Sequence, residues 1–214
     1  MLSKPDLSET LRKELPSDFL DLYDKHVVGG IGISGDFFIN HMAILKKHGI
    51  YEQLLLFEYV EGDEKIIKSK TLHKAFLACN RETLREICED MPTDQSEYTV
   101  FRGATEERKL GVSWTLCRLR ATHFACSVEN GRLYQTTVPA QDVLASLQEY
   151  FHEDELIIIP QSESVVELRI SPRIRKMLDR YYQEGFDYPP QDIKPANCNN
   201  CPNKVCLRLF GEHT

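Results

Sequence analysis

The stretch YTVFRGATEERKLGVSWTL, residues 98–116, marks the point at which the pattern of the chain changes. It contains two short apolar runs, YTVF and VSWTL, separated by a charged turn, and this arrangement is typical of β-strands. Similar runs follow at 132–138, 155–159 and 165–170. We therefore expect a strand-rich core over residues 93–186.

Helices are expected between and after these strands. The segment 118–126 predicts a short helix, and 141–150 predicts another, because three of its apolar residues recur at helical spacing. A last helix is expected over 173–183, with Ser171 as its N-cap and Pro172 in its first position.

The first 92 residues predict a mainly helical region. Apolar residues recur every three or four positions in 7–25, and further helices are expected over 36–48 and 71–90. The last segment, 187–214, contains prolines, asparagines and cysteines without any apolar period. We therefore expect three parts: a helical region over 1–92, the core over 93–186 and a tail over 187–214.

Composition limits the class of protein. The chain has 214 residues, a formal net charge of -7 and 42% hydrophobic residues, which disfavours a disordered chain. It has no apolar run of about 20 residues and no signal-peptide layout at its start, so we expect a cytoplasmic protein without membrane partners. The acidic balance makes binding to nucleic acid by bulk charge unlikely, although it leaves a local basic patch open. The last helix is basic but lacks interleaved aromatic residues that would stack bases.

Candidate site residues fall on three successive strand segments: Arg102 and Gly103, then Ser113 and Thr115, then Glu153 and Glu155. In their order and flanks these motifs resemble the ADP-ribosyltransferases of the arginine-serine-glutamate type, the cholera-toxin-like class. The flanks are VFRG, GVSWTL, ATHFA, VPAQDVLA and EDELIIIP, and the resemblance covers residues 98–170. It implies an α+β fold with a core of two facing β-sheets, which line one NAD-binding cleft, beside the helical N-terminal region.

The resemblance also implies an activity. A mono-ADP-ribosyltransferase moves ADP-ribose from its substrate NAD to an acceptor and releases nicotinamide. A glutamate at position 153 implies a protein arginine as acceptor, with NAD hydrolysis when water takes its place. Family members of this kind act as toxins, bacterial or phage effectors, or modifiers of host proteins, so an inhibitory or antitoxin partner is expected.

Each residue type suits a part of this reaction. A fixed carboxylate at Glu155 would stabilise positive charge that develops on the ribose, and Glu153 would orient the acceptor and take its proton. The guanidinium of Arg102 suits the pyrophosphate or adenosine side of NAD. Ser113 would hold Glu155 by a hydrogen bond, and Thr115 would support the same wall, because residues two apart in a strand share a face.

Two other patterns compete with this assignment. Gln161 and Glu163 have the same spacing as the glutamate pair, but Glu155 is followed directly by the apolar run LIIIP. The run from Gly30 to Gly35 fits the dinucleotide fingerprint G-x-G-x-x-G, with Glu58 further along. A true fingerprint follows a buried strand, and the residues before Gly30 indicate a helix, so we interpret this run as a loop.

The tail carries four potential zinc ligands: Cys198, Cys201, Cys206 and His213. Thiolates and imidazole in this number suit a tetrahedral zinc site, although the spacing matches no zinc module that we can name. Together with the helical region, this tail suggests an alternative function. The chain would then be a non-enzymatic module that binds a protein or nucleic acid, with a degenerate transferase core and a zinc-binding tail.

Overall fold

The computed structural model describes residues 7–25, 35–61, 70–88, 95–147 and 154–183. The chain divides into two compact units, Met1–Glu89 and Asp90–Thr214. The boundary expected at residue 92 lies in 89–94, outside the described residues. Within the described ranges, none of the helices combines the length and the apolar character that crossing a membrane requires.

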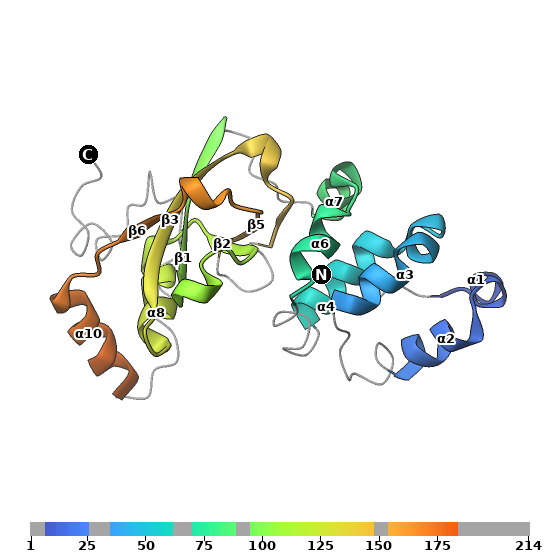
Figure 1. The fold of residues 1–214 in the computed structure, drawn as a ribbon, viewed down its shortest axis with the longest axis horizontal. Coiled ribbons are helices and arrows are strands. Elements are labelled where there is room, and N and C mark those ends of the chain that lie inside the picture. Colours follow the sequence, from blue (N-terminus) through green and yellow to red (C-terminus); the bar gives the residue numbers. More distant parts are fainter. Residues whose placement is uncertain (1–6, 26–34, 62–69, 89–94, 148–153, 184–214) are drawn as a thin grey trace. The chain divides into compact units, whose positions relative to one another are not determined.

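The first unit is built from helices in its described residues (Figure 1). They are α1 (Glu9–Glu14), α2 (Ser17–Tyr23), α3 (Gly35–Lys47), α4 (Tyr51–Glu61), α6 (Leu72–Leu77) and α7 (Arg81–Ile87). Helix α3 contacts both α4 and α6, and α4 contacts α7. The helix expected over 36–48 is therefore confirmed as α3, while α4 was not predicted.

Two helices that the sequence predicted as continuous are each divided. Residues 7–25 form α1 and α2, because Pro16 disfavours helical geometry at Leu15, which adopts an extended ψ of 142°. In the second case, the described residues 71–88 contain α6 and α7, because the side chain of Asn80 accepts hydrogen bonds from the backbone N–H groups of Glu82 and Thr83 and starts a new helix.

A buried carboxylate ties the helices of this unit together. Glu52, on α4, is 5% exposed and accepts a 2.7 Å hydrogen bond from the backbone N–H of Asn80. Beside it, the hydroxyl of Tyr51 donates to the carbonyl of Ala75 on α6. Most of the glycine run at 30–35 lies outside the described residues, but Gly35 begins α3 and Glu58 lies in α4. A helix that begins at the last glycine is compatible with a dinucleotide fingerprint, but the position of Glu58 in a helix instead of after a second strand is not.

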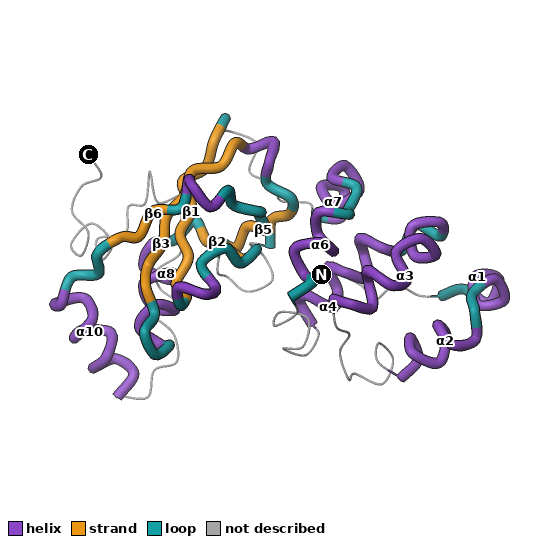
Figure 2. Tube along the Cα trace, viewed as in Figure 1, coloured by secondary structure: helices purple, strands orange, loops and turns teal. Residues whose placement is uncertain are grey.

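The second unit contains an antiparallel sheet (Figure 2). Its strands are β1 (Glu97–Ala104), β2 (Ser113–Thr115), β3 (Arg132–Pro139), β4 (Ala145–Ser146), β5 (Glu155–Ile157) and β6 (Val166–Leu168). Their order across the sheet is β4-β5-β2-β1-β3-β6. Strands were therefore predicted correctly in five segments, and β4 was missed.

The expected pair of facing sheets is replaced by one six-stranded sheet in the described residues. Strand β1 joins what would otherwise be two sheets. It pairs with β3 along its whole length, from Glu97 to Ala104, and it also pairs with β2. The pairing with β2 is limited to Phe101 and Thr115. The sheet thus consists of two three-stranded halves, β4-β5-β2 and β1-β3-β6, that meet at this one residue pair.

The helix expected over 141–150 is wrong for its described residues, 141–147. A short 3-10 turn over Ala140–Asp142 is followed by β4, in which Ala145 pairs with Ile157 and Ser146 with Leu156. The three apolar residues that suggested a helical stripe, Val143, Leu144 and Leu147, are all buried in the sheet region. Pairing with β5 therefore overrides the local helical spacing.

Helices were predicted correctly at two other places in this unit. Helix α8 (Arg118–Ser127) follows β2, and α10 (Pro172–Gln183) ends the described chain. Ser171 caps α10, because its Oγ accepts a hydrogen bond from the backbone N–H of Ile174. Helix α10 packs on α8.

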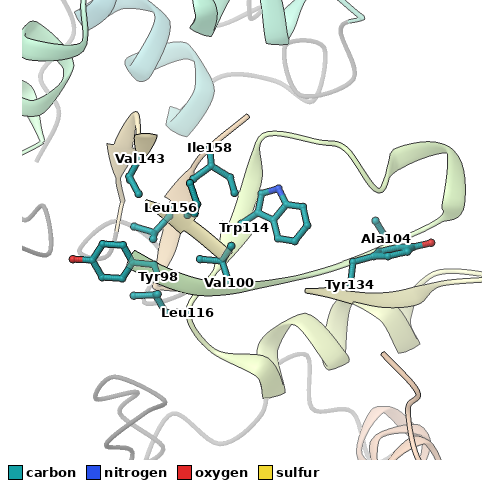
Figure 3. Packing of buried hydrophobic residues seen from close by; sticks show 10 residues of the cluster. Tyr98, Val100, Ala104, Trp114, Leu116, Tyr134, Val143, Leu156 and Ile158 are labelled. Carbon is teal, nitrogen blue, oxygen red and sulfur yellow. The ribbon is translucent and has the colours of Figure 1, made fainter. Parts of the chain in front are cut away.

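The sheet buries side chains on both faces. One face carries a large cluster that includes Val100, Trp114 and Leu156, gathered along the sheet in Figure 3. On the other face Phe101 and Leu133 pack against α8. Neighbours across paired strands share a face, so the register assigns every strand residue to one of these two sides.

Gly103 permits α8 to lie directly on β1. A Cβ atom at this position would stand 2.1 Å from the carbonyl oxygen of Ala121 and 2.3 Å from the backbone nitrogen of Ala125. Both atoms belong to the helix backbone, which cannot move out of the way without separating the helix from the sheet. The absence of a side chain at Gly103 therefore determines how closely α8 approaches.

We predict that Gly103→Ala destabilises the second unit by about 1–3 kcal/mol, the usual cost of overpacking. Urea unfolding followed by fluorescence measures this directly, because Trp114 is the one tryptophan of the sequence and is buried in this unit. Glu97→Ala, at the exposed end of the same strand, is the control and should change stability by less than about 0.5 kcal/mol. Equal effects of the two variants would contradict the packing assigned to Gly103.

Candidate functional site

The junction of the two half-sheets brings together residues far apart in the sequence. Thr115 pairs with Phe101 on one side and with Glu155 on the other, so these three residues form one row across β1, β2 and β5. Their side chains share the sheet face that α8 covers. Glu155 is only 5% exposed, so its carboxyl group lies largely shielded from bulk water.

Ser113 lies diagonally to Glu155 on the same face. Its direct partner on β5 is Ile157, whereas Glu155 stands opposite Thr115. Diagonal neighbours in an antiparallel pair are about 7–8 Å apart at the Cα atoms, compared with about 5 Å for direct partners. Thr115 is thus the closer neighbour of Glu155 by register, and the hydrogen bond predicted between Ser113 and Glu155 stays a prediction.

Arg102 stands on the opposite face of β1 from this row, because it follows Phe101 directly in an extended strand. Its guanidinium donates to the backbone carbonyls of Arg108, at 3.1 Å, and Ser113, at 2.5 Å. Gly111 makes room for it, since a Cβ there would stand 2.2 Å from Nη2 of Arg102. Arg102 therefore links β1 to the loop that leads into β2, and so supports the strand that carries Ser113.

The start of α8 is coupled to the same strand. The Oγ1 atom of Thr115 accepts a 3.0 Å hydrogen bond from the backbone N–H of Cys117, the N-cap residue of the helix. Thr115 is 6% exposed and Cys117 is 4% exposed. Thr115 thus connects the row at the junction to the first turn of α8. Gly103, the candidate site residue beside Arg102, has its open side filled by the middle of α8, and its contact with NAD stays a prediction.

Asp154 is a residue of this region to which sequence reasoning gave no role. It has a positive φ of 48°, which is uncommon outside glycine, and directly precedes Glu155. Burial, together with the nearby Cys117 thiol and against the opposing effect of Arg120, raises the pKa of its carboxyl group to about 7. Its Oδ2 atom is buried without a hydrogen-bond partner among the described residues.

No sequence pattern identifies Asp154, because an aspartate between two glutamates in front of a strand is typical of a solvated turn. The signal exists only in the fold, where the Oδ2 atom of Asp154 is buried and its carboxyl group lies near Cys117 and Arg120 at the start of α8. His123, on α8, is buried, and this burial, together with the positive charge of Arg120, lowers the pKa of its imidazole.

Several predicted site residues are not among those that the structure describes. They are Glu153 and all four potential zinc ligands of the tail. In the described part of the chain no three His, Cys, Asp or Glu side chains form a group that could hold a metal ion. The alternative glutamate, Glu163, lies exposed in a 3-10 turn, Ser162–Ser164, between β5 and β6, where Ser162 donates to it.

Comparisons with known proteins find no match to this chain. This holds for protein-family models, for curated proteins and for solved structures. The case for a function therefore depends on the residues of the chain itself.

We predict that the unfolding free energy of the second unit, measured relative to that of Asp154→Asn, falls as the pH rises from 5 to 8. The pKa of Asp154 is raised in the folded protein from an ordinary 3.8 to about 7, so between these values the folded state binds more protons than the unfolded state. Unfolding free energy then falls with increasing pH across this window. The asparagine variant does not titrate and should lack this component.

Urea unfolding at pH 5 and pH 8, followed by Trp114 fluorescence, measures the difference between the two proteins at each pH. Subtracting the unfolding free energy of the variant from that of the unaltered protein cancels the contribution of all titrating groups that the substitution leaves unchanged. A difference that is the same at both pH values would show that the carboxyl group of Asp154 titrates as in the unfolded chain.

Proposed function

We propose that the chain is a mono-ADP-ribosyltransferase that transfers ADP-ribose from NAD to an acceptor, with release of nicotinamide. The observation that supports this function best is the row at the junction, where Glu155 stands opposite Thr115 and diagonally to Ser113. The sequence pattern required residues of these types on neighbouring strands of one core. A second support is the division of the sheet into two halves that meet at Thr115 and Phe101.

The burial of Glu155 suits the chemistry of this reaction. As the bond between nicotinamide and ribose breaks, its electron pair leaves with nicotinamide and positive charge develops on the ribose. A carboxylate shielded from water acts on such a charge more strongly than an exposed one. Glu155 is largely shielded and held by pairing on both sides, with Thr115 on β2 and with β4 through its carbonyl, which accepts from the N–H of Leu147.

The other predicted residues support the site in different ways. Ser113 and Thr115 form the wall beside Glu155, and Arg102 holds the carbonyl of Ser113. Arg102 faces the other side of β1 from Glu155, so its part in this site is to order strand β2, and its contact with the pyrophosphate of NAD stays a prediction. The new bond joins the ribose carbon to the acceptor atom, and the acceptor loses a proton, for which Glu153 is the proposed base.

The acceptor and partners remain proposals that follow from the resemblance. They are a protein arginine as acceptor, water as a competing acceptor, and an inhibitory partner protein that limits the activity, all in the cytoplasm.

We predict that the protein releases nicotinamide from NAD labelled in that group, and that Glu155→Gln lowers the rate by at least about 100-fold. Glutamine preserves the shape of the side chain but removes the charge that opposes the developing cation. The measurement is release of labelled nicotinamide by the full chain, alone and with a cell lysate that supplies acceptors.

Glu163→Gln is the matched control, because Glu163 is an exposed residue of the competing motif and should leave the rate within about twofold of the unaltered protein. A large effect of Glu163→Gln with a small effect of Glu155→Gln would assign the reaction to the other motif. If neither release nor transfer occurs with any lysate, the chain is not a transferase.

A further inference from the structure

Asp154 is held by a backbone hydrogen bond immediately before β5 begins. The carbonyl of Asp154 accepts a 3.1 Å hydrogen bond from the backbone N–H of Leu116, at the end of β2. The next residue, Glu155, is the first of β5, and its carbonyl accepts a 2.9 Å hydrogen bond from Leu147. Any movement of Asp154 therefore changes the position of the residue that carries the proposed catalytic carboxylate.

The backbone of Asp154 is held in an unfavourable conformation. Its φ of 48° lies in the left-handed region, which costs an aspartate on the order of 1 kcal/mol and a glycine almost nothing. A left-handed residue also interrupts the alternation of side chains along a strand, as in a β-bulge, and such features often redirect a side chain next to an active site. The side chain of Asp154 therefore points in a different direction from that of an ordinary strand residue at this position.

The side chain adds a second cost. Its Oδ2 atom is buried without a hydrogen-bond donor among the described residues. Two groups act on its charge: Cys117, the N-cap residue of α8, disfavours a negative charge, and the guanidinium of Arg120, on α8, favours one. Toward β2, the carbonyl of Asp154 accepts the hydrogen bond from Leu116, and its neighbour at the start of β5 is the acidic Glu155. In this setting a neutral carboxyl group is more stable than a charged one.

We propose that Asp154 is a positioning residue for Glu155: with a proton on its carboxyl group the turn holds Glu155 opposite Thr115, and loss of that proton displaces both. The catalytic consequence of this inference rests on the proposed function, but the displacement does not. A carboxylate without a donor is drawn toward water, and the left-handed turn must follow it. The proton is exchanged with solvent, and no other reactant is needed.

The first test observes the displacement by NMR, with carboxyl groups labelled by ¹³C and backbone amides by ¹⁵N. Between pH 5 and 8.5 the amide signals of Leu116 and Glu155 should shift with one midpoint, the same as that of the Asp154 carboxyl carbon. In Asp154→Asn, which tolerates a positive φ and stays neutral, these shifts should disappear. The inference is overturned if the amides do not titrate, or if they titrate equally in the variant.

The second test measures catalysis in the same proteins. Nicotinamide release by the unaltered protein should fall at least about threefold between pH 6 and 8.5, whereas Asp154→Asn should keep its pH 6 rate. A purely structural role would lower the rate of the variant at every pH and leave the profile unchanged. Glu163→Gln should follow the unaltered protein throughout.

The two tests separate failure of the inference from failure of the proposed function. If no protein releases nicotinamide while the amide shifts occur as expected, the function is wrong and the coupling of Asp154 to the turn stands. If release occurs without a pH-dependent difference between the unaltered protein and Asp154→Asn, the function stands and the positioning role of Asp154 is wrong.

Discussion

The pairing of Thr115 with Phe101 is the constraint on which the second unit depends. It is the contact in the register through which the halves β4-β5-β2 and β1-β3-β6 become one sheet. The same threonine pairs with Glu155 and accepts a hydrogen bond from the first residue before α8. One residue thus links both half-sheets, the covering helix and the proposed catalytic carboxylate, so the geometry of the site and the stability of the core are set by the same contacts.

Arg102, a candidate ligand of NAD, also has a structural role. A guanidinium has a planar set of donors, and here two of them bind backbone carbonyls of the loop between β1 and β2. The indole N–H of Trp114 donates to the carbonyl of Gly111 in the same loop. These contacts order the loop that leads into Ser113, so a substitution at Arg102 affects strand β2 as well as any ligand near it.

Alternation of apolar residues was enough to predict five of the strands, and cap residues predicted α10, because these signals are local. The helix expected over 141–150 failed because pairing with β5 outweighs helical spacing, and two facing sheets were expected because the link at Phe101 is a contact between distant segments. The motifs identified Ser113, Thr115 and Glu155 as residues on neighbouring strands. They could not identify the left-handed conformation of Asp154, which depends on its burial in the fold, or show that Arg102 faces the other side, which follows from the register.

We propose that the junction forms part of a site for NAD, and thermal unfolding in the presence of NAD is the direct test. A ligand that binds the folded state raises the melting temperature in proportion to the logarithm of its concentration once it exceeds the dissociation constant. Fluorescence of the buried Trp114 reports this for the second unit alone. The account predicts a rise of the Trp114 transition that grows with NAD concentration and is absent with nicotinamide alone. An unchanged transition at millimolar NAD would contradict it.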